Sequence, residues 1–194
     1  MQRRTKAAQD ATRRTATLPY PKELETRTEL PQLGPVFVRP VRPEDEAGFK
    51  ESFTKMTPED IRMRFFAPMK QLPDDMAHQL TNIDYDREMA LVMLRVREGD
   101  IVGVSRMIII KNQRAEFAVA VRSDMKGLGI GRFLMKCLVD YARTRRVREL
   151  YGDILRENVP MTEFMRGLGF ALEDIPESEA IIRARLHLAE SSPG

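Results

Sequence analysis

The sequence AEFAVAV at residues 115–121, the turn KGLGIG at 126–131 and the segment that continues to residue 146 decide the fold. Large apolar side chains alternate with small or charged ones along the first stretch, which predicts a half-buried β-strand. From residue 129 to 146 the apolar residues recur every three or four positions, which predicts an amphipathic helix. A glycine-rich turn between such a strand and helix lets backbone N–H groups approach a ligand, and its usual occupant is an anion such as pyrophosphate.

Two better-known glycine motifs do not match this turn. A P-loop requires glycine, four residues and then Gly-Lys-Ser/Thr, whereas Gly131 is followed by Arg132 and Phe133. A dinucleotide-binding loop belongs to a parallel strand–helix–strand unit that opens a domain. The turn at 126–131 follows three sequential strands that we expect to be antiparallel. The turn therefore belongs to neither of these nucleotide-binding classes.

The segments on either side of this stretch predict a mixed sheet. Strands joined by hairpins are expected at 89–96, 101–110 and 115–121, and further strands at 36–39, at 149–154 and within 180–188. Helices are expected from Pro43, from Pro58 with Thr57 as the N-cap, from Asp74 to about residue 80, and at 159–168. This order predicts an α/β (α+β) fold in which a mixed, mainly antiparallel central sheet is flanked by helices.

The composition limits the class of protein. The chain has 194 residues, of which 42% are hydrophobic and 31% charged, as is typical of one folded domain and not of a disordered or collagen-like chain. No apolar run approaches the roughly 20 residues that a membrane helix requires, so we expect no contact with a membrane. Cys137 is the only cysteine and cannot form a disulfide within the chain, so we expect a cytoplasmic protein.

The N-terminal residues differ in character from the rest. We expect a basic, flexible arm and a proline-rich linker at 1–35, followed by the domain at 36–194. Residues 1–17 carry five Lys and Arg side chains and one Asp, so the basic charge of the chain belongs to this arm. Such an arm either contacts an anionic surface such as nucleic acid or is simply solvated, and its composition favours the solvated terminus.

Glu116 is the candidate for acid–base chemistry. The alternation of a strand places Phe117, Val119 and Val121 on one face and leaves Glu116 on the other face with two alanines. A carboxylate beside methyl-sized side chains leaves room for a ligand. The alternative is a glutamate that faces solvent on a half-exposed strand. The strand also leads directly into the glycine turn, so the Glu116 carboxylate and the predicted anion site lie at the two ends of one strand.

These residues carry a resemblance to a known family. The turn at 126–131 is similar to the Gln/Arg-x-x-Gly-x-Gly/Ala loop of the GNAT superfamily of acetyl-CoA-dependent N-acetyltransferases. More narrowly, the chain resembles the acetyltransferase domain of bacterial Pat-type protein lysine acetyltransferases. The stretches that carry the narrower resemblance are PYPKEL at 19–24, RPVRPED at 39–45, IDYDREMA at 83–90 and DILREN at 153–158.

The resemblance implies a site and a reaction. Acetyl-CoA is the implied acyl donor and no metal is implied; the acceptor is a protein lysine, with an acyl-CoA synthetase as the implied partner. Glu116 corresponds to the general base, and Asn158 to an asparagine that binds the cofactor near its thioester. The backbone of Val119, Ala120 and Val121 corresponds to the part that pairs with the pantetheine arm. The pyrophosphate turn corresponds to Lys126, Gly127, Leu128, Gly129, Ile130, Gly131 and Arg132.

Two positions depart from the family pattern. Lys126 stands where Gln or Arg is usual and keeps the positive charge. Met165 stands where many members have a tyrosine that protonates the leaving thiolate, which leaves the general acid unassigned. Two other readings of the function stay open, namely a small-amine acetyltransferase and a non-catalytic acyl-CoA-binding regulatory module.

Other reactive side chains are assigned structural roles. Cys137 falls on the apolar face of its helix and is expected in the core. His78 and His187 lack neighbours at metal-ligand spacing, so we expect no metal site. The polar run of Asp84, Asp86, Arg87 and Glu88 either borders an acceptor cleft or caps a turn, in which Asp86 and Arg87 pair.

Overall fold

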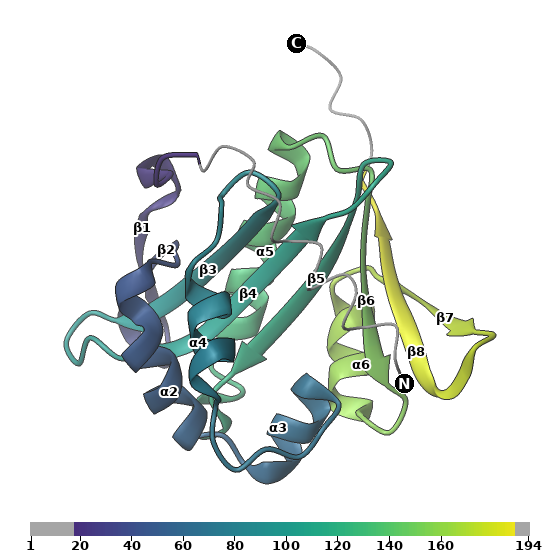
Figure 1. Ribbon diagram of the computed structural model, residues 1–194, viewed down its shortest axis with the longest axis horizontal. Coiled ribbons are helices and arrows are strands. Elements are labelled where there is room, and N and C mark those ends of the chain that lie inside the picture. The colour runs from purple at the N-terminus through teal and green to yellow at the C-terminus, as the bar shows by residue number, and fades with distance from the viewer. Residues whose placement is uncertain (1–17, 189–194) are drawn as a thin grey trace.

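The computed structural model describes residues 18–188, so the basic arm at 1–17 lies outside the described residues, as do residues 189–194 (Figure 1). The strands are β1 (Thr26–Leu30), β2 (Gly34–Pro40), β3 (Glu88–Arg95), β4 (Ile101–Ile109), β5 (Arg114–Val121), β6 (Glu149–Leu155), β7 (Ala171–Ile175) and β8 (Ser178–His187). The α-helices are α2 (Glu46–Thr54), α3 (Pro58–Phe65), α4 (Asp74–Thr81), α5 (Ile130–Thr144) and α6 (Val159–Gly167). Short 3₁₀ turns are η2 (Lys22–Leu24), η3 (Pro43–Asp45) and η4 (Ser123–Met125).

The strands form one eight-stranded sheet in the order β1-β2-β3-β4-β5-β6-β8-β7. Every neighbouring pair is antiparallel except β5 and β6, which are parallel and are connected through α5. A parallel pair requires a crossover of this kind, and here the glycine turn and α5 supply it. The prediction of a mixed, mainly antiparallel sheet flanked by helices is confirmed.

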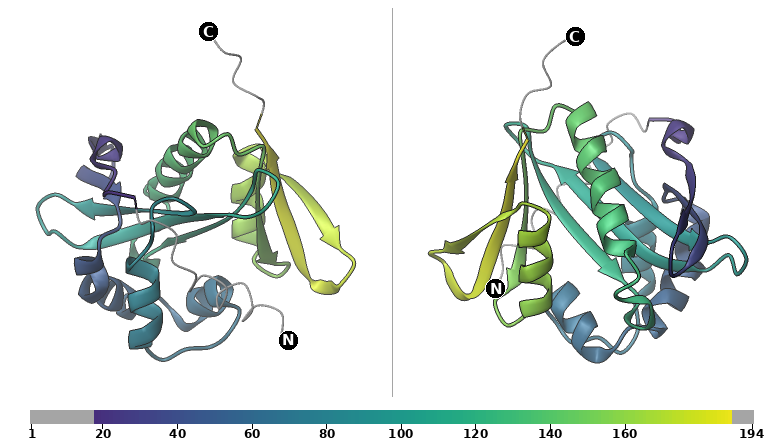
Figure 2. Two further views of the ribbon diagram at one scale, coloured as in Figure 1. Left: turned by 45° about the horizontal axis from the view of Figure 1, so that its top comes forward. Right: turned by 180° about the vertical axis from the view of Figure 1, so that it is seen from behind.

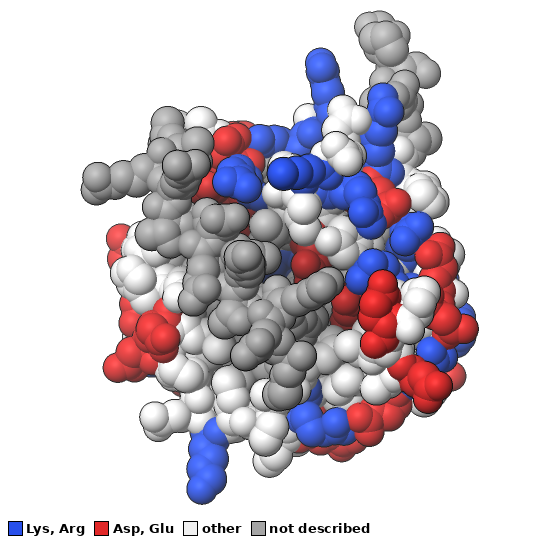
Figure 3. Space-filling view, turned by 45° about the vertical axis from the view of Figure 1, so that its right-hand side comes forward, with Lys and Arg blue, Asp and Glu red and all other residues white. Residues whose placement is uncertain are grey.

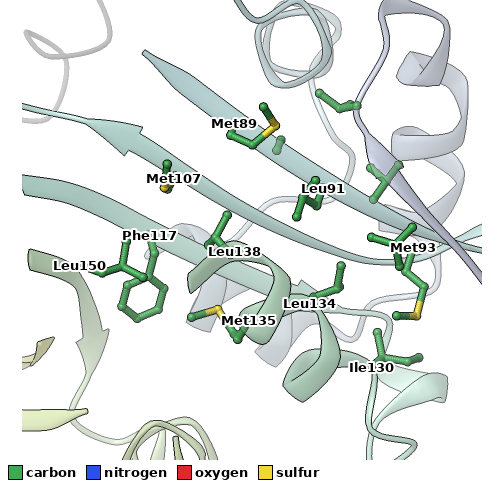
Figure 4. Packing of buried hydrophobic residues seen from close by; sticks show 14 of the residues in the cluster. Met89, Leu91, Met93, Met107, Phe117, Ile130, Leu134, Met135, Leu138 and Leu150 are labelled. Atoms are coloured by element: carbon green, nitrogen blue, oxygen red, sulfur yellow. The ribbon is translucent and has the colours of Figure 1, made fainter. Parts of the chain in front are cut away.

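Helices cover both faces of the sheet. In Figure 2, α5 and α6 lie on one face, while α2, α3 and α4 lie on the other. The apolar side of α5 presents Ile130, Leu134 and Leu138 to the sheet, and each of these is at most 1% exposed (Figure 4). Burial of a side chain of this size stabilises the fold by roughly 1.5–3 kcal/mol. The helix predicted from the apolar periodicity is therefore confirmed, and it anchors the end of the glycine turn.

Most of the helices and strands were predicted from short sequence signals such as caps and prolines. Thr57 caps α3 as predicted, since its hydroxyl oxygen accepts a hydrogen bond from the backbone N–H of Asp60 at 3.2 Å. The helix expected from Pro43 begins as the 3₁₀ turn η3 and becomes α-helical from Glu46. Within residues 18–188, no helix combines the length and the apolar character needed to cross a membrane.

Two strands were not among the expected elements. Strand β1 lies in the stretch that we read as a linker, and it forms by pairing with β2, for example Thr26 with Val38. Strand β7 forms in the same way by pairing with β8. Both are edge strands, and Leu30 is the only one of their residues that is buried. Their sequences therefore lack the apolar alternation from which a strand is predicted, and the neighbouring strand supplies the missing information.

Candidate active site

The parallel pair β5 and β6 separates partway along its length. The two strands pair only at Arg114 with Glu149, Ala115 with Leu150 and Glu116 with Tyr151, and they diverge beyond these positions. Glycine is required at position 152, immediately after the last pair. A Cβ atom there would lie 2.8 Å from the ring of Phe117 and 3.0 Å from its carbonyl oxygen. The two strands thus stay in close contact as far as Phe117 and Gly152, and the sheet splits beyond them.

A cleft of about 660 Å³ occupies the split. Strands β5 and β6 form two of its walls, the glycine turn and the start of α5 close one end, and α3 and the first turn of α6 border it. The predicted site residues that line it are Glu116, Val119, Ala120, Val121, Lys126, Gly127, Gly129, Ile130, Gly131, Arg132 and Asn158. Leu128 is not among the residues that line the cleft. The structure therefore gathers nearly all of the predicted residues in one cavity.

The backbone of β5 offers hydrogen-bonding groups to the cleft. The N–H of Arg122 donates to the carbonyl of Val102 on the β4 side at 3.0 Å. Because the backbone groups of successive residues in a strand point to opposite sides, those of Ala120 face β4 and those of Val119 and Val121 face the cleft. Ala120 contributes its methyl group to the wall instead. A ligand in the cleft can therefore pair with two residues of β5 as a neighbouring strand would.

Glu116 lies at the point where β5 and β6 separate, beside Tyr151. Burial and the negative charge of Glu116 raise the pKa of the Tyr151 phenol, so the phenol is neutral at physiological pH. The guanidinium groups of Arg114 and Arg183 lie 4.8 and 4.9 Å from the centroid of the Tyr151 ring. Such cation–π contacts hold the ring in place next to the carboxylate.

A second carboxylate, that of Asp153, also lines the cleft. Asp153 lies two residues after Tyr151 on β6, and Tyr151 pairs with Glu116 of β5. The side chains of Glu116, Tyr151 and Asp153 therefore lie on the same face of the sheet. Arg183 on β8 holds the Asp153 carboxylate with two hydrogen bonds, from Nε at 2.8 Å and from Nη2 at 3.1 Å. Asp153 begins the DILREN stretch that carries the family resemblance, but no role was predicted for its side chain. Two carboxylates therefore line the cleft, and Arg183 fixes that of Asp153.

The glycine turn has the backbone conformation that its sequence requires. Gly127 and Gly129 have φ angles of +78° and +82°, in the left-handed region that residues with a Cβ atom rarely adopt. A Cβ atom at either position would meet no atom within 4 Å, so the space beside the turn is open to a ligand. Gly129 is also the N-cap of α5, whose first N–H groups have no partner within the helix. This arrangement fits an anion such as a pyrophosphate.

Helix α3 is fastened to the glycine turn by an ion pair. Lys126 Nζ contacts Asp60 of α3, which also accepts a hydrogen bond from the hydroxyl of Ser123. Burial opposes ionisation of Asp60, but the hydrogen bonds from Lys126 and Ser123 outweigh it and lower the pKa of the carboxyl. Further along α3, Arg62 pairs with Glu157 at 2.7 Å. Sequence reasoning gave α3 no part in the site, because residues 60 and 126 are far apart in the chain.

Asn158 and Met165 have different places relative to the cleft. Asn158 lines it and caps α6, since its side-chain oxygen accepts from the N–H of Met161 at 3.2 Å. Met165 is fully buried and is not among the residues that line the cleft. A side chain at position 165 therefore packs in the core, and the aromatic residue of α6 that reaches the cleft is Phe164.

The remaining sequence candidates lie away from the cleft. The side chain of Asp84 accepts hydrogen bonds from the backbone N–H groups of the next residues, at 2.9 Å for Arg87, so the polar run caps a turn. Asp86 pairs with Arg145 at 2.9 Å and not with Arg87. Cys137 packs against the core, where burial and then Asp140 raise the pKa of its thiol. Across residues 18–188, no group of His, Cys, Asp and Glu side chains is arranged to hold a metal ion.

Comparison with known proteins identifies the family. The model of the acetyltransferase (GNAT) family matches residues 56–170. The chain is also 31% identical over 156 residues to an acetyltransferase of Pseudomonas aeruginosa, which covers 79% of this chain and 84% of that protein. The chain therefore belongs to the GNAT family of acetyltransferases.

Solved structures share the fold. The GNAT domain of S. lividans PAT has a TM-score of 0.81 at 22% sequence identity and covers 88% of this chain and 100% of that one. The spermidine N-acetyltransferase of Vibrio cholerae, in complex with CoA and spermine, has a TM-score of 0.64 at 19% identity and covers 78% and 95%. A cAMP-binding acyltransferase of Mycobacterium smegmatis has a TM-score of 0.58 at 23% identity, covering 87% of this chain and 48% of that one.

Proposed function

We propose that the chain transfers the acetyl group of acetyl-CoA to the ε-amine of a lysine in another protein, with Glu116 as the general base. The observation that carries the proposal is that Glu116 and the glycine turn lie at opposite ends of β5 in one cleft. The five residue steps from Glu116 to Val121 span roughly 17 Å of extended strand. A pyrophosphate at the turn and a thioester near Glu116 can thus be joined by an extended arm along β5.

The residues of the cleft fit acetyl-CoA. The open backbone at Gly127 and Gly129, with Arg132 in the first turn of α5, suits the pyrophosphate. The cleft-facing backbone groups of Val119 and Val121 suit the amides of the pantetheine arm. The V. cholerae neighbour was solved with CoA, and its shared fold supports the same donor here. The substrate would therefore lie with its phosphates at the turn and its acetyl group at the split.

The chemistry required of the protein is modest. A lysine amine has an ordinary pKa of about 10.4 and is protonated at neutral pH, so a base must remove a proton before its nitrogen attacks the thioester carbon. Glu116 takes that proton, directly or through one water molecule. The N–C bond forms and the C–S bond breaks, while the backbone N–H of Val119, which faces the cleft closer to Glu116 than that of Val121, donates to the carbonyl oxygen as its negative charge develops. After the attack the nitrogen still carries one proton too many, and water can pass this proton to the departing thiolate, which is a fair leaving group because its thiol has a pKa near 8.5.

An acyl-CoA synthetase is the acceptor that we propose. The stretches at 19–24, 39–45, 83–90 and 153–158 resemble Pat-type protein lysine acetyltransferases, and this resemblance supports a protein acceptor. The cleft also suits an amine acceptor in general, since the Glu116 carboxylate at its end can take a proton from an amine. A small amine would satisfy the second of these observations but not the first.

The test combines calorimetry with mass spectrometry. The purified chain is titrated with acetyl-CoA and with CoA, and an acyl-CoA synthetase is then added and searched for acetylated lysines. Glu116→Gln is expected to lower the transfer rate at least about 100-fold with nearly unchanged acetyl-CoA affinity. Glu163→Gln, at an exposed position of α6, is the matched control and should be as active as the parent chain.

Each other outcome contradicts a defined part of the proposal. Acetylation of small amines but of no protein would replace the protein acceptor with a small-molecule one. Binding of acetyl-CoA without any transfer would indicate a regulatory module. If acetyl-CoA does not bind at all, the assignment of the glycine turn is wrong.

A further inference from the structure

The two ends of the cleft serve different partners, and this determines where an acceptor approaches. The glycine turn closes the cleft at the Val121 end of β5. Glu116 lies near the other end, two residues after the strand begins at Arg114. The Arg114 guanidinium lies over the ring of Tyr151, the strand partner of Glu116, so the surface around the start of β5 adjoins the place where an acceptor lysine would meet the base. The surface around this start is where a protein acceptor would make its contacts.

Four cations gather at this place, and we call them the basic edge: Lys111, Arg114, Arg146 and Arg148. Lys111 belongs to the hairpin between β4 and β5, while Arg146 and Arg148 follow the end of α5. The two segments are joined by a hydrogen bond from the N–H of Arg148 to the carbonyl of Gln113 at 2.7 Å. Figure 3 shows Lys and Arg side chains gathered along the upper edge of the molecule, where Figure 1 places this hairpin and the end of α5.

The basic edge keeps a net positive charge at its surface. Lys111, Arg146 and Arg148 are exposed, and 41% of the Arg114 side chain is accessible. The adjoining carboxylate of Glu149 pairs with Arg114 at 2.7 Å but is only 13% exposed. Among the described residues, Lys111 and Arg146 thus add exposed positive charge beside an Arg114–Glu149 pair whose carboxylate is mostly covered. The edge is also continuous with the site, because the Arg114 guanidinium lies over the Tyr151 ring beside Glu116.

We propose that the basic edge docks an acidic surface around the acceptor lysine of the partner protein. This inference rests on the proposed protein acceptor. It specifies further that the acceptor surface around the lysine is negatively charged. Opposite charges on two surfaces speed their encounter and fix their orientation, which favours acceptors whose lysine is flanked by Asp and Glu. Polyamines carry only positive charge and would be repelled at the same edge. Nucleic acid carries no alkylamine that could accept the acetyl group, so we favour a protein.

The first experiment compares two fluorescent peptides with the same central lysine, one flanked by Asp and Glu and the other by Lys and Arg. Binding to the CoA-saturated protein is measured by fluorescence anisotropy, and acetylation is measured as kcat/KM. At low ionic strength the acidic peptide is expected to bind about tenfold more tightly and to react about tenfold faster, at the low end of electrostatic steering effects. The preference should shrink as salt is added, because salt screens exposed charges.

The second experiment reverses two charges of the edge. The Lys111→Glu, Arg146→Glu double variant should lose the preference for the acidic peptide while its affinity for acetyl-CoA by calorimetry stays unchanged. The matched control is Lys70→Glu, Arg97→Glu, which changes the net charge equally at two exposed positions away from the edge, in the α3–α4 and β3–β4 connections. It should keep the preference of the parent chain.

The outcomes separate this inference from the proposed function. Binding that prefers the acidic peptide without acetylation would support the edge and contradict the proposed transfer. Acetylation of both peptides at equal rates with equal binding would overturn the edge and leave the transfer intact. An equal loss in the control variant would show that only net charge matters and would also overturn it. A 20-base single-stranded RNA that binds to the edge more tightly than the acidic peptide would assign the surface to nucleic acid instead.

Discussion

Asp60 would compete with the proposed substrate, acetyl-CoA, for Lys126. The ion pair between them joins α3 to the glycine turn at the place where we expect the pyrophosphate. The lowered pKa of Asp60 keeps this carboxyl ionised at neutral pH, so a negative charge lies beside an anion site. A phosphate group that takes over Lys126 must therefore displace a carboxylate. The lysine is held near its expected ligand before the ligand arrives, and α3 is held with it.

Asp60→Asn is expected to tighten acetyl-CoA binding. The change removes a competing negative charge while an amide can still accept from Ser123, and a partly exposed ion pair contributes at most about 1 kcal/mol. We expect a gain in affinity of about two- to fivefold at low salt, measured by calorimetry. Asp174→Asn removes the carboxylate that pairs with Arg156, and position 174 does not line the cleft, so it serves as the control. Weaker binding by Asp60→Asn would show that the ion pair orders the turn for the substrate.

At the scale of elements, the glycine turn and the split between β5 and β6 create the site together. The turn orients the start of α5, and the split exposes one side of β5. Either feature alone is common in α/β proteins. Their combination defines a cleft whose two ends are joined by a single strand, and for this reason the conformation of the turn matters to binding.

Gly129→Ala is expected to weaken acetyl-CoA binding at least about tenfold. Alanine at φ +82° is strained, and relief of this strain moves the N–H groups at the start of α5. Gly99→Ala is the matched control, because Gly99 also has a positive φ angle, of +72°, and open space for a Cβ atom, but it lies in the β3–β4 hairpin. Both variants should lose about 1 kcal/mol of stability, measured by urea denaturation. Equal acetyl-CoA affinities in the two variants would contradict the role of the turn.

Elements that are determined by nearby residues could be predicted from the sequence. The alternation around Glu116, the helical spacing after Gly129 and the cap at Thr57 each depend on a few consecutive residues. Strands β1 and β7 could not be predicted, since their pairing partners and not their own apolar residues define them. The places of Asp60, Asp153 and Phe164 in the cleft could not be predicted either, because they depend on contacts between segments that are far apart in the chain. Gly152 did carry a signal, because a glycine within a strand often marks a close backbone approach.

Over the whole molecule, all four tyrosines are held in the neutral form. Burial is the first cause in each case, and it raises the pKa of Tyr20 to about 12, with help from a hydrogen bond to Glu25. Burial likewise raises the pKa values of Tyr85, Tyr141 and Tyr151. These side chains come from distant parts of the fold, namely the N-terminal segment, the turn before β3, helix α5 and strand β6. Their titration therefore reports on the integrity of the entire structure.

Stability is expected to fall as the pH rises above about 10. In the unfolded chain tyrosine titrates near pH 10, whereas in the folded chain the pKa is higher, so the folded state binds more protons above this pH. The stabilisation is present in full below pH 10 and is lost as the pH rises through the folded-state values, toward 12 for Tyr20. Phenolate absorbance near 295 nm and urea denaturation measure the two effects. A native titration centred at pH 10 would contradict the burial of these side chains.

The split also leaves the sheet open in its interior. Between Glu116 and Val121, strand β5 has a bonded neighbour on one side and a cleft on the other, so part of a central strand behaves like the edge of a sheet. The amide protons of Val119 and Val121 should exchange rapidly with deuterated solvent, while those of Ala118 and Ala120 are retained by β4. We expect acetyl-CoA to slow only the exchanging pair, because in the proposed binding mode its pantetheine arm would take the place of the absent strand. The substrate would then complete the hydrogen-bond ladder of the sheet. Without substrate, the unpaired backbone groups of β5 could instead pair with an unpaired strand of another molecule.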